Sequence, residues 1–216
     1  MKLSKRIPIS PDFFCDGDGY VLTSSSLGNS NLTPQKFSDL VLDGSFNDIK
    51  PVLEKGVCMP ILFEADCVLD RKTLFVLGDL TEKEEKEWIA KLSWKLNIPC
   101  GKLILFCSCM TEDVARAISG KEPEENYMIY QTVDVPPDLY KVEIYAYRHS
   151  PTYWLTLSDE EYEEFEENEG DLLDGDYDED GNLITVGYII RLSPLKENLV
   201  LPNLGDTWFK DFEFRK

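Results

Sequence analysis

Short apolar runs divided by turn signals predict the elements of the N-terminal part of the chain. A short extended segment over residues 6–9 and a strand over 20–23 flank CDGDGY, whose two Asp-Gly pairs are a strong turn signal. Thr33-Pro34 predicts the start of a helix, because threonine caps a first turn well and proline is favoured just inside it. Asp43-Gly44 predicts the end of that helix.

The pattern from residue 57 to residue 80 predicts a β-hairpin. In its first arm, apolar residues at 63, 65, 67 and 69 alternate with acidic residues at 64 and 66, which is typical of a half-buried strand. Polar residues at 70–72 supply the turn. The second arm, TLFVLGDL, is apolar nearly throughout, so we expect a central strand that is buried on both faces.

A helix is predicted over residues 81–96. Thr81 and Glu84 have the spacing of a capping box, in which each side chain satisfies a backbone N–H of the first turn. Apolar residues at 88, 89, 92 and 96 form one stripe at helical spacing, and Asn97-Ile98-Pro99 ends the pattern.

The same signals predict the remaining elements. In chain order these are a buried strand over 102–108, a short helix over 111–118 capped by Thr111, a second hairpin with arms 129–135 and 141–148, an acidic helix opened by a Ser158–Glu161 capping box, and a strand over 183–192. The aromatic tail 207–216 fits a strand or a helix equally well.

The predicted strands outnumber the predicted helices and occur mainly in hairpins, without regular strand–helix alternation. The sequence therefore predicts an α+β fold with largely antiparallel, sandwich-like sheets and about four helices packed on them, not a doubly wound parallel sheet. The polar stretch KEPEEN at 121–126 is the candidate domain boundary. It would separate an α+β half, 1–120, from a β-rich half, 127–216, unless both halves form one continuous domain.

Two stretches resemble known proteins. VLGDLTEKEEKEWIAKLSWKLNIPCGKLIL and YQTVDVPPDLYKVEIYAY together resemble a group of uncharacterised bacterial conserved hypothetical proteins. The second stretch is also similar to a strand-turn-strand element of small bacterial β-sandwich proteins, including competence-type nuclease inhibitors. The first resemblance implies no activity, and neither assigns a catalytic residue.

The charge of the chain is concentrated in one segment. The formal net charge is −19, and residues 159–180 hold 14 acidic residues and no basic one. Without these 14, the other 27 acidic residues face 22 basic ones, which is an ordinary, mildly acidic balance. Such a segment disfavours nucleic acid and anionic membrane as partners, since both bind clustered Lys and Arg, and it favours cations or a basic protein surface. The oligomeric state is left open.

The apolar runs and the cysteines predict a cytoplasmic protein. No run approaches the roughly 20 apolar residues of a membrane span, and the beginning, MKLSKRIPIS, lacks the apolar core of a secretory signal. The six cysteines show no Cys-x-x-Cys spacing, so we expect reduced, mostly buried thiols and no zinc site. Cys107 and Cys109 would share one side of a strand, which leaves a redox pair there as the alternative.

The strongest candidate for chemistry lies within the acidic segment. Asp176, Asp178 and Asp180 with Gly181 match the first half of a calcium loop, D-x-D-x-D-G, and Asn182 could add its backbone carbonyl. A complete loop needs a bidentate Glu at its twelfth position, where Gly187 stands. The two interpretations are a solvated acidic loop and a Ca²⁺ or Mg²⁺ site completed by a carboxylate from elsewhere. No other cofactor is indicated.

The other acidic and basic candidates have simpler explanations. Asp16 and Asp18 fit a turn, and Glu64 with Asp66 fits a solvated sheet face, with Asp79 expected on the partner strand. The only histidine, His149, follows a strand and is best explained as a surface loop residue. We therefore expect a non-enzymatic acidic binding or accessory protein, of inhibitor or immunity type, that meets a basic partner. The alternative is a divalent-cation-binding protein or metal-dependent hydrolase that uses the Asp176–Asp180 loop.

Overall fold

The structure is a computed structural model that describes residues 4–15, 17–66, 68–70, 72–107, 109–169, 183, 185–204 and 207–215. Within these ranges the strands form two sheets, with the orders β1-β4-β9-β8-β5-β10 and β3-β2-β6-β7. The strands are β1 Lys5–Pro8, β2 Gly19–Ser24, β3 Cys58–Leu62, β4 Thr73–Leu77, β5 Ala90–Ile98, β6 Lys102–Cys107, β7 Tyr130–Asp134, β8 Asp138–Ala146, β9 Tyr188–Pro194 and β10 Glu213–Phe214. All neighbouring strands pair antiparallel except β4 and β9.

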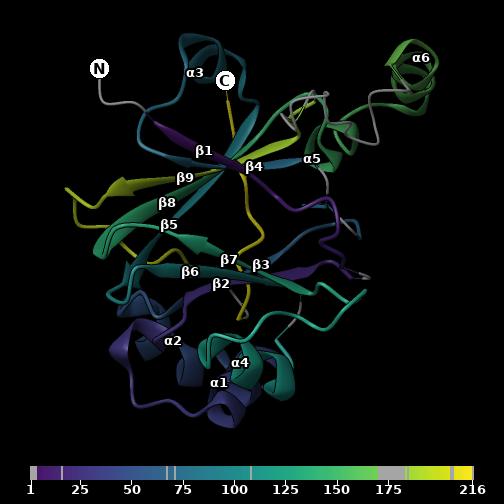
Figure 1. Ribbon diagram of the computed structural model, residues 1–216. Coiled ribbons are helices and arrows are strands. Elements are labelled where there is room, and N and C mark those ends of the chain that lie inside the picture. The colour runs from purple at the N-terminus through teal and green to yellow at the C-terminus, as the bar shows by residue number, and fades with distance from the viewer. Residues whose placement is uncertain are drawn as a thin grey trace.

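The helices lie mainly outside the two sheets. They are α1 Pro34–Leu42, α2 Phe46–Glu54, α3 Glu82–Glu87, α4 Thr111–Ile118, α5 Pro151–Trp154 and α6 Asp159–Glu169, with a 3₁₀ turn at Leu27–Asn29. Figure 1 shows the six-stranded sheet above the four-stranded sheet, with α1, α2 and α4 below the latter. The predicted α+β class with largely antiparallel sheets is therefore confirmed.

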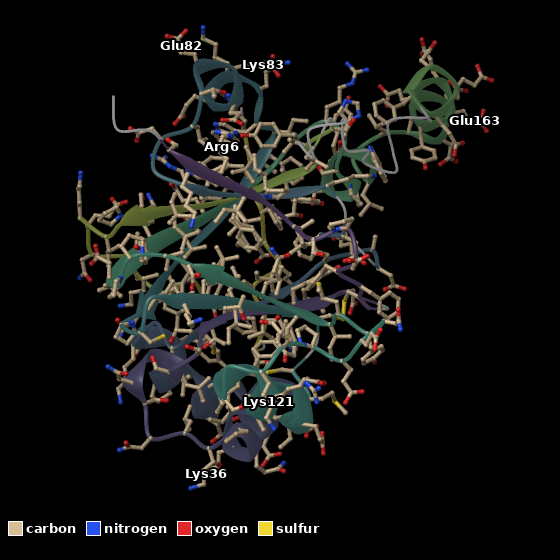
Figure 2. All side chains as sticks on the ribbon, viewed as in Figure 1. Arg6, Lys36, Glu82, Lys83, Lys121 and Glu163 are labelled. Atoms are coloured by element: carbon tan, nitrogen blue, oxygen red, sulfur yellow. A yellow bond between two sulfur atoms is a disulfide. The ribbon has the colours of Figure 1, made fainter. Side chains whose placement is uncertain are left out.

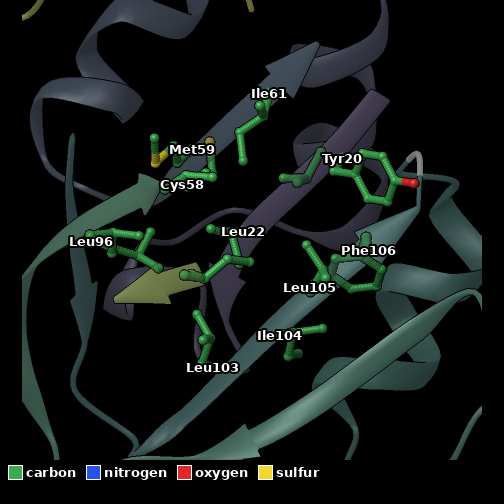
Figure 3. Packing of buried hydrophobic residues seen from close by; sticks show 14 of the residues in the cluster. Tyr20, Leu22, Cys58, Met59, Ile61, Leu96, Leu103, Ile104, Leu105 and Phe106 are labelled. Atoms are coloured by element: carbon green, nitrogen blue, oxygen red, sulfur yellow. The ribbon is translucent and has the colours of Figure 1, made fainter. Parts of the chain in front are cut away.

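One apolar core fills the space between the two sheets and continues between the four-stranded sheet and the helices that cover it. Its fully buried members include Leu22 of β2, Leu96 of β5 and Leu105 of β6. Figure 3 shows buried side chains of β2, β3 and β6 together with Leu96 of β5. Leu103 to Phe106 are all completely buried, because one face of β6 meets the other sheet and its other face meets the helices. The core draws residues from both sides of the 121–126 stretch.

The predicted helix over 81–96 is wrong beyond its first turns. The Thr81–Glu84 capping box is present, but α3 ends at Glu87 and residues 90–98 form β5. In AKLSWKLNI every second residue is apolar and buried, which is the period of a strand. A helix would have turned Trp94 away from the apolar stripe, whereas in β5 this side chain is 1% exposed and its Nε1 donates to the carbonyl of Leu53 at 3.0 Å.

The two predicted hairpins are also wrong. The alternating segment that predicted the first arm lies outside any strand, since β3 ends at Leu62 and the described residues 63–66 and 68–70 are turns and irregular backbone. The other three arms contain β4, β7 and β8. The arms β3 and β4 lie in different sheets, and so do the arms β7 and β8. Pro136 and Pro137 separate β7 from β8, and a proline has no N–H to donate to a ladder. Apolar alternation shows which face of a strand is buried, but it does not show which strand is the neighbour.

Local signals near the ends of helices were the most reliable. Thr33 caps α1 by accepting from the N–H of Lys36, and Ser158 with Glu161 forms the capping box of α6, both as predicted. At α4 the prediction was one residue late, since Met110 is the N-cap and Thr111 is already helical. Two helices, α2 and α5, were not anticipated, and α2 contains Pro51 in its interior.

Candidate protein-binding surface on α5 and α6

The aromatic side chain of Phe165 packs helix α6 against the rest of the protein. Phe165 is 5% exposed, and its ring lies 6.0 Å from that of His149, 6.1 Å from that of Tyr153 and 6.4 Å from that of Trp154. The guanidinium of Arg148 lies 5.3 Å from the centre of the same ring. The helix therefore has a fixed inner face and a fixed outer face.

The outer face of α6 carries the acidic residues. Among the described side chains of the helix, seven carboxylates are exposed: Asp159, Glu160, Glu161, Glu163, Glu164, Glu166 and Glu167. At 100° per residue, Glu160, Glu163 and Glu167 lie opposite Phe165 and form one outward stripe. Figure 1 shows α6 at the margin of the molecule beyond α5, and Figure 2 shows Glu163 at its outer side.

The first turn of α6 is fixed by its cap. The carboxylate of Glu161 accepts from the backbone N–H of Ser158 at 2.9 Å and from its hydroxyl at 2.8 Å. These hydrogen bonds favour the ionised carboxylate and lower the pKa of Glu161. The carboxylate of Glu161 is therefore ionised at neutral pH.

An apolar cavity of about 260 Å³ lies beside α5. It is bounded by the end of β3 and the residues after it, by α5 with the two residues after it, by β9 and by the C-terminal tail. Its lining residues are Leu62, Phe63, Glu64, Ala65, Val68, Pro151, Thr152, Leu155, Thr156, Tyr188, Lys210, Phe212 and Phe214. Helix α6 begins three residues after Thr156, so the first residue of α6 lies within about 11 Å of Thr156.

The calcium-type residues Asp176, Asp178, Asp180 and Asn182 lie outside the described residues, so this site stays a prediction. Within the described ranges, no group of three or more His, Cys, Asp or Glu side chains is placed to hold a metal ion. Calorimetric titration with Ca²⁺, compared between the parent chain and Asp178→Ala, tests the predicted site.

The other sequence candidates do not come together. Glu64 and Asp66 are exposed, and Glu64 lines the apolar cavity, whereas Asp79 lines a different cavity and pairs with Arg191 at 3.2 Å. Asp16 lies outside the described residues, and Asp18 is exposed. His149 is half-buried against Phe165, and its structural role is to anchor α6.

A buried charge network lies on the outer face of the six-stranded sheet. The predicted alternation in β8 is confirmed, since Val142, Ile144 and Ala146 face the core and Glu143 lies on the opposite face. Glu143 is 5% exposed. Its carboxylate lies 3.3 Å from Arg191, 3.3 Å from Lys141 and 4.0 Å from Lys91. Burial disfavours the Arg191 guanidinium, but its hydrogen bond with Tyr145 and nearby carboxylates outweigh burial and raise its pKa. We assign this network to stability.

The expectation that all thiols are reduced is wrong for one pair. Cys15 and Cys107 form a disulfide across 92 residues of sequence, with their Cα atoms 5.1 Å apart. The antiparallel pairing of β2 with β6 aligns Tyr20 with Cys107, which brings the segment before β2 to the end of β6. Cys107 therefore does not pair with Cys109, which is free and buried.

Because disulfides are rare in the cytosol, the cysteines no longer support the expected cytoplasmic location. No helix of the described residues is long and apolar enough to cross a membrane.

Cys100 is the reactive thiol among the described free cysteines, since burial raises the pKa of Cys58 to about 12 and that of Cys109 well above its ordinary value. Burial also opposes the Cys100 thiolate, but hydrogen bonds from Ser25 and Ser26 outweigh it and lower the pKa to about 7. We expect iodoacetamide to label Cys100 ahead of Cys58 and Cys109, with a half-maximal rate near that pH. Ser25→Ala, which removes the 3.1 Å contact, should move the midpoint upward in peptide mapping by mass spectrometry. An unchanged midpoint would contradict this cause.

Comparisons with known proteins give distant similarities. No protein-family model matches the chain, and no curated protein matches it. One similar solved structure is described as "Crocagin biosynthetic gene J", with 15% identity and a TM-score of 0.42 over 88% of this chain and 95% of that one. Another is ComJ from Bacillus subtilis, an inhibitor of the DNA-degrading activity of NucA, with 10% identity and a TM-score of 0.37 over 89% of this chain and 96% of that one. ComJ is a nuclease inhibitor, the class that residues 130–147 resemble, but similarities this distant carry no argument about function.

Sequence reasoning missed the apolar cavity and the Glu143 network. The cavity combines four segments that are far apart in the sequence, so no local pattern shows it. The network had a clearer signal, because Lys91, Ser93 and Lys95 alternate with apolar residues as Lys141, Glu143 and Tyr145 do. The helical interpretation of residues 81–96 concealed it.

Proposed function

We propose that this chain is a non-enzymatic binding protein, of accessory or inhibitor type, that docks a basic protein partner on the outer face of α6. The observation that carries the proposal is the rigid presentation of the acidic stripe. Phe165 and its aromatic neighbours orient the helix, so Glu160, Glu163 and Glu167 face solvent together. Clustered carboxylates of one sign accelerate the encounter with a positively charged surface.

The electrostatic character of this contact makes it sensitive to salt. Exposed charges separated by more than the Debye length, about 10 Å at 0.1 M salt, are largely screened. The seven described carboxylates of α6 are exposed, so their attraction for a basic partner should fall steeply as ionic strength rises. A contact dominated by apolar burial would not show this dependence.

Neutralising the outward stripe should weaken the binding of a cationic probe. We take a fluorescein-labelled, acetylated and amidated peptide KKGAGKK and measure its affinity by fluorescence anisotropy. The triple variant Glu160→Gln, Glu163→Gln and Glu167→Gln should bind it about 5-fold to 10-fold more weakly at low salt, since each lost charge removes a few tenths of a kcal/mol.

A matched variant separates this effect from net charge. Glu112→Gln, Glu122→Gln and Glu125→Gln change the charge by the same amount at exposed positions in or near α4, which Figure 1 places at the opposite end of the molecule. We expect this variant to weaken binding less than about 2-fold. Equal losses in the two variants, or an affinity indifferent to salt, would overturn the docking surface on α6.

A further inference from the structure

The floor of the cavity beside α5 is apolar although a tyrosine forms part of it. Tyr188 is completely buried, and its hydroxyl is hydrogen-bonded to Thr152 through the backbone N–H at 3.1 Å and the side-chain Oγ1 at 2.8 Å. Its polar group is therefore already satisfied. The ring of Phe63 packs against Tyr188 at 5.5 Å and against Phe212 at 5.8 Å, so the floor is built from aromatic rings.

The mouth of the cavity exposes large apolar side chains. Leu155 is 55% exposed and Phe214 is 49% exposed, and both line the opening. The exposed residues Glu64 and Lys210 add one carboxylate and one ammonium group to the lining. An apolar centre beside charged residues is the usual composition of a protein-binding hot spot.

The size of the cavity selects the kind of occupant. Pockets that enclose whole small molecules or cofactors measure about 300–1,000 Å³. The 260 Å³ of this cavity lies below that range, and it suits one large side chain. The α6 carboxylates begin within about 11 Å of its rim, so a cation that accompanies the side chain has acidic neighbours on α6 as well as Glu64.

We propose that this cavity is the anchor site for one aromatic or branched aliphatic side chain carried on a basic segment of the partner protein. The inference rests on the proposed function of α6 and adds the chemistry of the contact. The carboxylates attract the basic segment and set the rate of encounter, whereas the buried apolar side chain sets how long the complex lasts. The partner segment is thus a large apolar residue flanked by Lys or Arg.

Two peptides of equal charge test the anchor. The labelled peptides KKGFGKK and KKGAGKK differ only in the central side chain. Burial of the phenylalanine should make KKGFGKK bind at least about 10-fold more tightly than KKGAGKK. This ratio of affinities should be retained at high salt, because salt does not screen apolar burial. Anisotropy titrations with the full chain at two salt concentrations measure the ratio.

Variants of the cavity locate the effect. Leu155→Ala removes one wall, and Thr156→Trp fills the opening from an exposed position, so either should bring the Phe/Ala ratio close to one. Met110→Ala is the matched control, because Met110 is 53% exposed and lies outside this cavity, and the ratio should be unchanged. Unfolding midpoints check each variant, and Leu155→Ala decides the test if Thr156→Trp does not fold.

The outcomes separate the anchor from the acidic surface. Equal affinities of the two peptides for the parent chain, or a ratio that persists in both cavity variants, would overturn the anchor while leaving an α6-dependent affinity intact. A retained ratio with no dependence on salt or on the α6 triple variant would instead overturn the acidic docking surface. No binding of either peptide at millimolar concentration would overturn both.

Discussion

Removing the Cys15–Cys107 disulfide will lower the free energy of unfolding by about 3–5 kcal/mol. A cross-link stabilises mainly by restricting the unfolded chain, and closing a loop of this length restricts it by about 4–5 kcal/mol in the chain-entropy description. The two cysteines are 92 residues apart, so the loop is among the long ones. The double variant Cys15→Ala and Cys107→Ala, unfolded in urea, measures the loss.

Reduction supplies the control for this prediction. The parent chain should lose stability when a strong reductant is added, whereas the double variant should not respond, because its remaining described cysteines are free. If the urea unfolding midpoint of the parent chain does not change when the reductant is added, Cys15 and Cys107 are not bonded in solution.

Replacing Glu143 with alanine will lower the free energy of unfolding by about 2–4 kcal/mol. The substitution removes the carboxylate between Arg191, Lys141 and Lys91, all of which are largely shielded from water. Breaking a fully buried pair costs about 3–5 kcal/mol, because the other charge is left without compensation. We expect a somewhat smaller loss, because Arg191 keeps Asp79 and Lys141 keeps Glu197.

An exposed pair gives the comparison for Glu143. Lys83 and Glu87 lie 3.8 Å apart with side chains that are 79% and 57% exposed. Glu87→Ala should therefore cost less than about 1 kcal/mol in the same urea experiment. If Glu143→Ala cost no more than Glu87→Ala, the network would contribute nothing beyond an ordinary surface pair, and the stability role assigned to it would be wrong.

The comparison of β5 with α6 shows where sequence reasoning succeeds. The segments that contain β5 and α6 were both predicted as helices that begin with a capping box. Both capping boxes exist, one at the start of α3 and one at the start of α6. In α6 the predicted helix forms over Asp159–Glu169, with Phe165 buried. In β5 the residues alternate with period two, and pairing with β8 over nine residues overrides the helical tendency of its Ala, Lys and Leu residues.

The candidate site divides in the same way. The acidic segment and its cap could be predicted from consecutive residues, whereas the packing of Phe165 against His149, Tyr153 and Trp154 could not. The cavity could not, because Phe63, Leu155, Tyr188 and Phe212 come from four segments whose neighbours in space are set by the packing of the two sheets. The half-complete calcium motif lies outside the described residues and stays a prediction.

The sequence by itself determined the features whose causes lie within a few residues. These are the capped starts of α1 and α6, the alternation of β8, the α+β class and the concentration of charge in residues 159–180, including the acidic face of α6. Only the tertiary structure decided which strands are neighbours, that Cys15 meets Cys107, and that α5 closes an apolar cavity beside the acidic helix. Helix caps depend on hydrogen bonds between residues a few positions apart. Apolar alternation depends on which face of the strand is buried. Strand pairing depends on contacts between residues far apart in the sequence, and these form only when the whole core packs.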